Sequence, residues 1–278
     1  MEERKRLGRG LEDVSRFYLS SRPRGASERT RKSDSQPVTR HVIRIFYPGS
    51  SLIKSCFLAN FALELARNRF HVDIWDGDRS EGIRVGTMLQ QVVRQGLYPG
   101  AGTVKLYGLP DILVYDADVQ PEGKLHDLKE SSCLERDRFF LVSTPDSLES
   151  VLEWDTAFDA ILLAPIDGAS LLRCYAYCKV IWERDPSSRV HIAFDNPGSE
   201  TRAHEIFSRF SGFVKERLSR DPHFLGCLVH DDLLEGSIAE HKPIVLSYEA
   251  SAAKDSLLAM SASFIESGQG HAPTGSAI

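Results

Sequence analysis

Residues 41–78 read HVIRIFYPGSSLIKSCFLANFALELARNRFHVDIWDGD and divide into four parts. The apolar run 42–47 predicts a strand, and a short segment of small residues follows it. A helix with Lys54 and Ser55 in its first turn comes next, and a second strand ends at Asp76-Gly77-Asp78. A loop and a helix N-terminus in this order offer backbone N–H groups and partial positive charge, which suits the binding of a phosphate-like anion.

The loop departs from the phosphate-loop pattern G-x-x-x-x-G-K-[S/T] at the residue before the lysine, where Ile53 replaces glycine. A β-branched residue with positive φ would be rare, so we predict a reshaped loop instead of a strained one. Two simpler interpretations stay open at this point. Lys54 could be a solvated lysine at a helix start, and Asp76-Gly77-Asp78 could be only a turn.

The composition is typical of a soluble globular protein, with 278 residues, 42% hydrophobic and 26% charged. No apolar run approaches about 18 residues, and the charged N-terminus precedes no apolar run, so we predict neither a membrane span nor a secretory signal and expect a cytoplasmic protein. The five cysteines are scattered through apolar segments, which favours reduced core thiols. Cys174 and Cys178 could form half of a metal site, but core positions are favoured.

The first forty residues differ in charge from the rest of the chain. They hold 11 Lys/Arg and 6 Asp/Glu and so carry +5, whereas the remainder carries −10. Residues 11–19, LEDVSRFYL, have the spacing of a short amphipathic helix, and 20–40 resemble a flexible linker. We therefore predict a basic arm at 1–40, a folded domain at 41–266 and a tail at 267–278. The short helix either packs on its own domain or binds a protein partner.

Apolar runs and helical periods alternate through the folded domain. Strands are predicted at 104–107, 112–115, 139–142, 160–164, 190–194 and 224–229, and helices at 82–96, 124–138, 147–158, 170–184, 200–220, 233–241 and 252–266. Continuous apolar strands alternating with helices predict an α/β protein, a three-layer α/β/α arrangement around a mostly parallel sheet.

Polar groups gather where the predicted strands end. They are the loop 48–55, Asp76, Asp78, the segment 143–146, Asp167, Asp195 and Asn196. Ligands of parallel sheets bind at the carboxyl ends of the strands, so these positions predict a cleft. Turn-forming residues also collect at strand ends for conformational reasons alone.

The order of these motifs resembles the MinD/ParA class of P-loop ATPases, in particular the FlhG/FleN-like flagellar-number regulators, over residues 41–266. That class has an opening loop like SGKGGVGKTT, then NLAxxLA and a strand ending D-A-D, where this chain has FYPGSSLIKSC, NFALELA and DIWDGD. The family's D-T-P-A-G matches STPDS, and its TTPEPTSLTDAYALIK segment resembles APIDGASLLRCYAYCK. A final RRPxxLxYPxSPAA stretch resembles HKPIVLSYEASAAK. The resemblance implies the P-loop NTPase fold with a deviant Walker A loop.

The resemblance implies a role for each matching residue. Lys54 stands where the family has the lysine that holds the β- and γ-phosphates, and Ser55 stands where the family has the hydroxyl that ligates Mg²⁺. Asp76 and Asp78 match the pair that helps to hold the metal and positions the attacking water. The candidate catalytic residue is therefore Asp78, the candidate metal ligands are Ser55 and Asp76, and the candidate nucleotide-binding residues are Gly49, Ser50, Ser51, Lys54, Ser55, Cys56 and Asn196.

Other family positions are changed. Gly49 replaces the signature lysine that stabilises transition-state charge, and Ser143 replaces a metal-linked aspartate. Ser50, Ser51 and Ile53 replace loop glycines. We therefore expect ATP and Mg²⁺ to bind weakly or not at all.

The leading hypothesis is a MinD/FlhG-like regulatory protein that acts through protein contacts, with weak or absent hydrolysis. Its partner would be a protein, bound through residues 11–19 or as a second copy of the chain. The alternative is an active ATPase switch that dimerises on ATP, of the cell-positioning, flagellar-number or partitioning type. A ParA-like protein that binds nucleic acid through the basic arm is less favoured, and no stable membrane anchor is expected.

Overall fold

The computed structural model of the chain describes residues 40–48, 51–77, 85–89, 93–94, 101–104, 112–116, 138–143, 145–152, 154, 157–247 and 249–269. All of them lie in one compact unit, Pro37–Ile278. The helix predicted at 11–19, the linker, nearly all of the helix predicted at 124–138 and most of the tail lie outside the described residues. The division into arm, domain and tail therefore stays a prediction.

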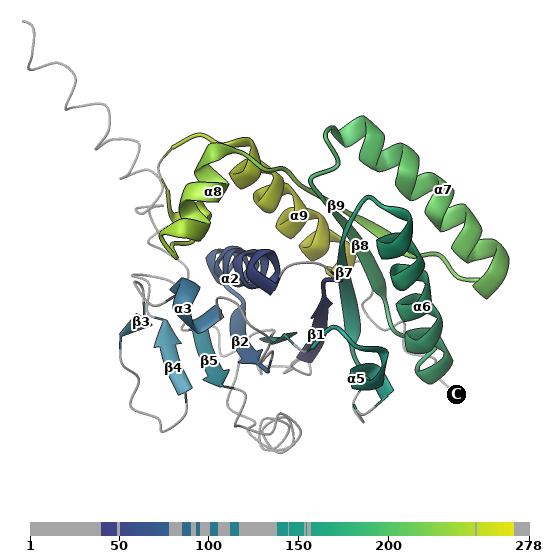
Figure 1. The fold of residues 1–278 in the computed structure, drawn as a ribbon. Helices are drawn as coiled ribbons and strands as arrows, with labels where there is room; N and C mark the ends of the chain where they lie inside the picture. The colour runs from purple at the N-terminus through teal and green to yellow at the C-terminus, as the bar shows by residue number, and fades with distance from the viewer. Residues whose placement is uncertain are drawn as a thin grey trace, which may run out of the picture. The chain divides into compact units, whose positions relative to one another are not determined.

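The described strands form one sheet in the order β3-β4-β5-β2-β6-β1-β7-β8-β9 (Figure 1). From β5 through β9 every neighbouring pair is parallel. β3 and β4 add antiparallel strands at one edge. The bounds are β1 Arg40–Phe46, β2 His71–Asp76, β3 Val93–Arg94, β4 Ala101–Val104, β5 Ile112–Asp116, β6 Arg138–Ser143, β7 Asp159–Pro165, β8 Val190–Asp195 and β9 His223–Leu228. The predicted α/β class with a mostly parallel sheet is confirmed.

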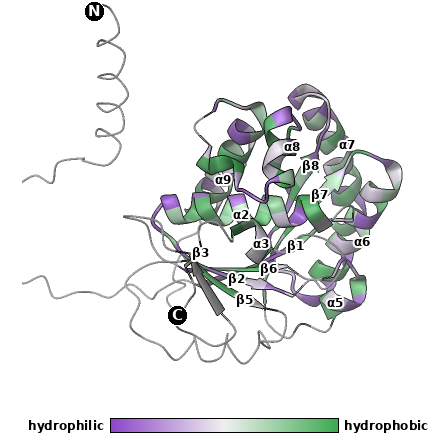
Figure 2. Cartoon of the chain, turned by 60° about the vertical axis from the view of Figure 1, so that its left-hand side comes forward, coloured by the Kyte–Doolittle hydropathy of each residue, from purple (hydrophilic) through white to green (hydrophobic). Residues whose placement is uncertain are grey.

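Helices cover both faces of the sheet, as Figure 1 shows. One layer contains α2 (Ser51–Arg67), α8 (Asp232–Ala239) and α9 (Ala252–Gln269), with α3 (Val85–Leu89) and the 3-10 turn η1 (Ile244–Leu246) beside them. The other contains α5 (Leu148–Leu152), α6 (Gly168–Arg184) and α7 (Glu200–Leu218). Both faces of the central strands are therefore buried, which explains why these strands are mostly apolar, with few polar residues such as Arg44 in β1 and His191 in β8 (Figure 2).

Helix α2 is buried on all sides. Every residue from Lys54 to Ala66 is buried, because the sheet covers one side and α8, α9 and η1 cover the other. Polar groups inside such a helix need hydrogen-bond partners. The Asn60 amide donates to the Cys56 carbonyl at 2.7 Å and accepts from the Val245 backbone N–H at 3.0 Å. This contact fastens η1 to the middle of α2.

The close approach of α9 to β9 depends on Gly226. Its φ is +138°, a conformation that side-chain-bearing residues rarely adopt, and it lies where the β8–β9 register shifts. A Cβ at this position would lie 2.6 Å from Cγ of Met260 in α9. The missing side chain therefore lets the last helix pack directly on the edge strand.

Three predicted elements differ from the structure. The helix predicted at 82–96 is wrong in its second half, because Val93–Arg94 forms β3 and pairs with β4. The strand predicted at 104–107 lies earlier, at Ala101–Val104, and the helix predicted at 147–158 has a described helical part of only Leu148–Leu152. The other strands and the helices from α6 onward lie within a few residues of their predicted bounds.

No helix in the described part of the chain combines the length and the apolar character that crossing a membrane requires.

Candidate functional site

The candidate site lies at the carboxyl edge of the parallel strands. Lys54, Ser55 and Cys56 are in the first half of α2, directly after β1, and Asp76 is the last residue of β2. Asn196 follows β8 at the same edge, with a left-handed φ of +45° that asparagine tolerates. Gly49, Ser50, Asp78 and the side chain of Ser51 lie outside the described residues, so their predicted roles stay predictions.

The loop between β1 and α2 is shorter than a phosphate loop. Helix α2 begins at Ser51, so Leu52 and Ile53 already belong to its first turn. The φ of Ile53 is not positive, and its side chain packs against the hydrophobic core. Ile53 is therefore not strained, as predicted, whereas Gly49 and Ser50 of the loop lie outside the described residues and the reshaping of the loop stays a prediction. Residues that curl around an anion in a phosphate loop are here part of a helix, because glycine no longer provides the necessary backbone freedom.

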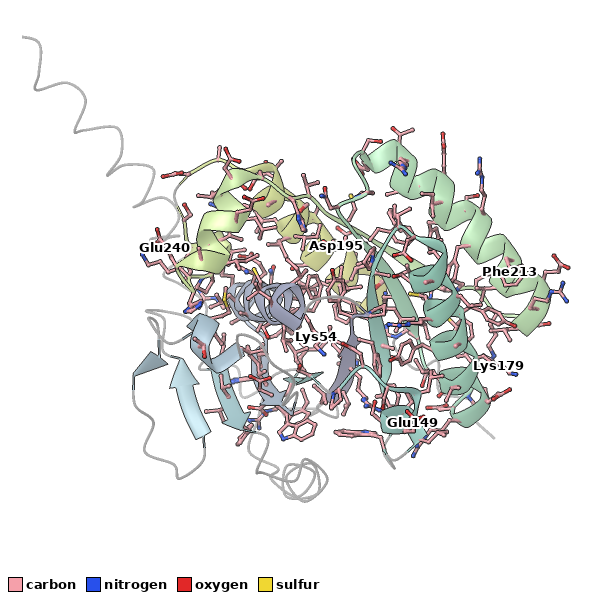
Figure 3. The ribbon with its side chains drawn as sticks, viewed as in Figure 1. Lys54, Glu149, Lys179, Asp195, Phe213 and Glu240 are labelled. Carbon is pink, nitrogen blue, oxygen red and sulfur yellow. The ribbon has the colours of Figure 1, made fainter. Side chains whose placement is uncertain are left out.

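The Lys54 side chain is buried and forms an ion pair within the chain. Its exposed fraction is 0%, and Nζ lies 3.0 Å from Oδ2 of Asp146 (Figure 3 labels Lys54). The other carboxylate oxygen of Asp146 accepts a hydrogen bond from the Tyr47 backbone N–H at 2.7 Å. The interpretation of Lys54 as a solvated lysine is therefore wrong. The carboxylate bridges the end of β1 and the first turn of α2.

Arg44 of β1 contacts the segment that follows Asp146 and stabilises it. The Arg44 guanidinium donates to the Ser150 carbonyl at 2.9 Å and to Ser150 Oγ at 3.2 Å. It also lies 4.9 to 5.0 Å from the ring centroids of Phe46, Trp154 and Phe158. A fully buried arginine packed between aromatic rings leaves α5 little freedom, so the position of Asp146 is well determined.

The residue that caps α5 is not Asp146 but its neighbour Ser147. Oγ of Ser147 accepts from the Ser150 backbone N–H at 3.1 Å, which is the contact expected of a helix N-cap.

Both predicted metal ligands, Ser55 in α2 and Asp76 at the end of β2, are described and buried, and Ser143 lies beside Asp76. Asp76 and Ser143 are register partners on adjacent strands, and both are buried. Oδ2 of Asp76 accepts from the Val85 backbone N–H at 2.8 Å, so this carboxylate caps the start of α3. Oγ of Ser143 has no hydrogen-bond partner among the described residues. A hydroxyl therefore stands beside Asp76 where the resemblance implies a carboxylate.

A second polar cluster continues from Tyr47 across the same edge. The Tyr47 hydroxyl donates to Oδ2 of Asp195 at 2.6 Å, and Nε2 of His230 lies 2.6 Å from Oδ1 of the same carboxylate. Tyr47 and Asp195 are buried (Figure 3 labels Asp195). Tyr47 therefore contacts Asp146 through its backbone and Asp195 through its side chain, and it connects the end of β1 with the ends of β8 and β9.

The cysteines near the site are core thiols. Burial raises the pKa of Cys56 to about 12, against smaller opposing effects of hydrogen bonds with Asn60 and Ser237. Burial also raises the pKa of Cys174 to about 12 and that of Cys178 well above its usual value. Thiols with such pKa values are poor nucleophiles and poor metal ligands at neutral pH. The prediction of core positions for Cys174 and Cys178 is confirmed.

Two functional contacts were missed by the sequence reasoning. The sequence predicts Asp146 only as a polar residue at a strand end and Tyr47 only as the last residue of a strand. One signal for Asp146 was present, because in the alignment of STPDS with D-T-P-A-G it stands where the family has alanine. This signal marks Asp146 as unusual but does not identify Lys54 as its partner, because the two residues are 92 positions apart in the sequence.

Comparison with solved structures identifies the architecture. MinD in the MinC:MinD cell division complex of Aquifex aeolicus aligns with 81% of this chain and 96% of that chain, at 16% identity and a TM-score of 0.58. The chain has the MinD/ParA fold. MinD of Pyrococcus horikoshii, solved with Mg-ADP, aligns with 83% of this chain and 98% of that chain at 15% identity and a TM-score of 0.58. A putative plasmid partition protein of Borrelia burgdorferi, solved with AMPPNP, aligns with 82% of this chain and 100% of that chain at 12% identity and a TM-score of 0.55.

At these identities the likeness shows the MinD/ParA fold and nothing finer. The sequence matches no protein-family model, and no curated protein sequence matches it.

The MinD/ParA fold implies a magnesium nucleotide at this edge, and the described residues fit that group poorly. Lys54 and Ser55 have the required chemistry, but the ammonium of Lys54 is paired with Asp146. Asp76 is the one carboxylate on the described metal side, and it is buried against α3. In nucleotide sites Mg²⁺ takes several oxygen ligands from water and phosphate and one or two from carboxylates. Asp76 would be that carboxylate, with the Ser55 hydroxyl beside it, but Oδ2 of Asp76 already accepts from the Val85 N–H and Ser143 adds no charge.

Proposed function

We propose that the chain is a regulatory protein on the MinD/ParA fold that acts through protein contacts and hydrolyses ATP weakly or not at all. The observation that supports this most strongly is the buried ion pair of Lys54 with Asp146. A lysine that must hold β- and γ-phosphates has to present its charge to the nucleotide. Here the same charge is already balanced by a carboxylate of the chain.

The metal side supports the same conclusion. Phosphoryl transfer depends on electrostatic stabilisation by a bound cation and by positioned lysines. Ser143 contributes no charge beside Asp76, and Gly49 replaces the family's signature lysine. The groups that are changed are therefore those that support turnover, whereas the parallel strands β5 through β9 and the helices that cover them are present in the described residues.

A role in protein contacts is supported by exposed apolar side chains on the α6–α7 layer. Leu172 in α6 and Phe213 in α7 are 67% and 46% exposed, and Phe213 is labelled in Figure 3. A contiguous patch of exposed apolar side chains marks a surface that binds other proteins, and these two side chains would belong to such a patch. The amphipathic segment 11–19 is a second candidate for such a contact. The partner protein and a homodimer are both consistent with this proposal.

The test of the proposal is ATP turnover by the purified full-length chain. We expect phosphate release with Mg-ATP to stay at the background rate and to be the same in Lys54→Ala. Robust Mg-dependent turnover that disappears in Lys54→Ala would overturn the proposal and favour the active ATPase switch. Sedimentation with and without ATP would then show whether dimers form with the nucleotide.

A gain-of-function variant tests the same proposal from the opposite direction. The triple variant Gly49→Lys, Ile53→Gly and Ser143→Asp restores the charge, the loop glycine and the carboxylate that the family has. Calorimetric titration of Mg-ATP into this variant and into the wild type compares the two sites directly. Tight binding by the wild type contradicts the proposal.

A further inference from the structure

We propose that the C-terminal half of α9, residues 260–267, detaches from the sheet when the buried imidazole of His191 takes up a proton, while the rest of the domain stays folded. The inference goes beyond the proposed function, because the groups that carry it lie at the amino edge of the sheet, opposite the candidate site. His191 is the second residue of β8, and His223 is the first residue of β9.

Two rings contact the imidazole of His191 from neighbouring elements. His223 is its register partner on β9, with ring centroids 5.3 Å apart, and the ring of Phe264 in α9 lies 5.1 Å away. His191 and Phe264 are both buried, and Nε2 of His191 has no hydrogen-bond partner among the described residues. A neutral imidazole tolerates this packing, whereas an imidazolium has two N–H donors and a full charge to satisfy.

The charged groups around His191 do not compensate for an added proton. On β7, the carboxylate of Asp159 already accepts from the guanidinium of Arg189 at 2.6 and 3.0 Å and from the Arg189 backbone N–H at 2.8 Å. The C-terminal half of α9 has a single charged residue, Glu266, and it is exposed. Burial is the main cause that lowers the pKa of His191 from 6.5 to about 4; His223 and Arg189 add to this effect, and Asp159 opposes it.

The C-terminal half of α9 is held where this proton would bind. Phe264 packs on His191, and the carbonyl of Ser267 accepts from the Arg189 guanidinium at 3.4 Å. No described strand follows α9, so its departure breaks no strand pairing. A proton that binds more tightly to one state than to another shifts the equilibrium toward the state that binds it, which here is the detached one.

The N-terminal half of α9 is held by different contacts. The carboxylate of Asp231 accepts from the Ala253 backbone N–H at 3.1 Å, and Oγ of Ser256 accepts from the Val229 backbone N–H at 3.3 Å. Neither contact involves His191. Protonation of His191 therefore acts on the end of the helix and leaves its beginning in place.

The test is amide hydrogen exchange of the full chain at pH 7 and pH 5, with each rate divided by the intrinsic rate at that pH. If the detached state has the ordinary histidine pKa of 6.5, a folded pKa of about 4 makes opening about 20-fold more favourable at pH 5 than at pH 7. We therefore expect the protection factors of amides 260–267 to fall about 20-fold.

Low concentrations of urea separate local opening from global unfolding. Exchange in 260–267 should depend less on urea than exchange in α6, because local opening exposes less surface than unfolding of the whole domain. The protection of α6 should also be higher than that of 260–267 at both pH values.

Matched variants identify the group that binds the proton. His191→Phe keeps an aromatic ring that cannot be protonated, so the pH dependence of 260–267 should disappear. His204→Phe changes an exposed histidine of α7 and should keep the full effect. If His191→Phe does not fold, His191→Leu takes its place in the comparison.

Three results overturn the inference. The first is a protection of 260–267 that is the same at pH 7 and pH 5. The second is a pH dependence that persists in folded His191→Phe or His191→Leu. The third is an equal urea dependence in 260–267 and α6, which would mean that the domain opens as one unit. None of these results concerns ATP turnover, so the proposed function stands or fails separately.

Discussion

Two turns at the carboxyl edge of the sheet use an aspartate in different ways. In the turn after β7, Asp167 is exposed and accepts hydrogen bonds from Ser170, three residues further along the chain. The hydrogen bond from the Ser170 hydroxyl lowers the pKa of Asp167, with a smaller contribution from the Ser170 backbone. In the turn after β6, Asp146 instead contacts Tyr47 and Lys54, which lie 99 and 92 positions away in the sequence.

The difference shows that a strand-end aspartate contributes according to what caps the next helix. Where the aspartate is itself the cap, it stabilises one helix locally. Where a serine takes that position, as Ser147 does for α5, the aspartate side chain can join elements that are distant in sequence. Removal of the two aspartates should therefore have very different effects.

The largest expected effect is that of Asp146→Ala on stability. This change leaves the buried ammonium of Lys54 without the Asp146 carboxylate, and breaking a buried ion pair costs about 3 to 5 kcal/mol. Asp167→Ala removes an exposed helix cap, so its effect should be clearly smaller. Urea unfolding at pH 7 measures both free energies. Equal losses in the two variants would remove the distinction between the turns.

The next effect concerns the support of the Asp146 turn. Arg44→Met removes the hydrogen bonds to Ser150 and the contacts with three aromatic rings. A buried cation–π contact together with charged hydrogen bonds is worth about 2 to 4 kcal/mol. We expect that loss in urea unfolding, with faster amide exchange in α5 than in α6. As a control, Arg173→Met in α6 should leave the exchange of both helices unchanged. Uniformly faster exchange across both helices would contradict a local role for Arg44.

The third effect is a loss of stability at low pH that is caused by the buried His191. His191 of β8 is 1% exposed, and burial, with a smaller contribution from His223, lowers its pKa from 6.5 to about 4. The unfolded chain therefore binds a proton that the folded chain does not, and stability falls as the pH decreases from 6.5 to 4. A shift of this size corresponds to a loss of about 3 kcal/mol at most.

Unfolding free energies measured between pH 7 and 4 check this prediction in His191→Phe. The variant should lose that slope, whereas His204→Phe, at an exposed position, should keep it. An unchanged slope in His191→Phe would show that other groups cause the acid sensitivity.

The smallest of these effects is that of Tyr47→Phe. This variant loses the hydroxyl that donates to Asp195, and a hydrogen bond to a charged group is worth about 1.5 to 3 kcal/mol. The backbone N–H that donates to Asp146 is kept, so the losses of Tyr47→Phe and Asp146→Ala in urea unfolding should add in the double variant. A clear departure from additivity would show that the two polar clusters depend on each other.

Much of the fold could be predicted from the sequence, because the central strands are mostly apolar on both faces, a pattern that a sheet covered on both faces buries. The edge strand β3 could not, since Val93–Arg94 lies in a segment with a helical period and becomes a strand only by pairing with β4. Lys54 could be found from its place after a strand. Its partner Asp146 could not, because their contact requires β1 and β6 to be neighbours, which no local pattern specifies.

A double-mutant cycle with Lys54→Met and Asp146→Ala tests most directly that the chain itself balances the charge of Lys54. Urea unfolding of the wild type, both single variants and the double variant yields the coupling free energy of the pair. The account predicts a coupling of about 2 kcal/mol or more, with the double variant more stable than Asp146→Ala alone. Additive losses within about 0.5 kcal/mol would contradict it.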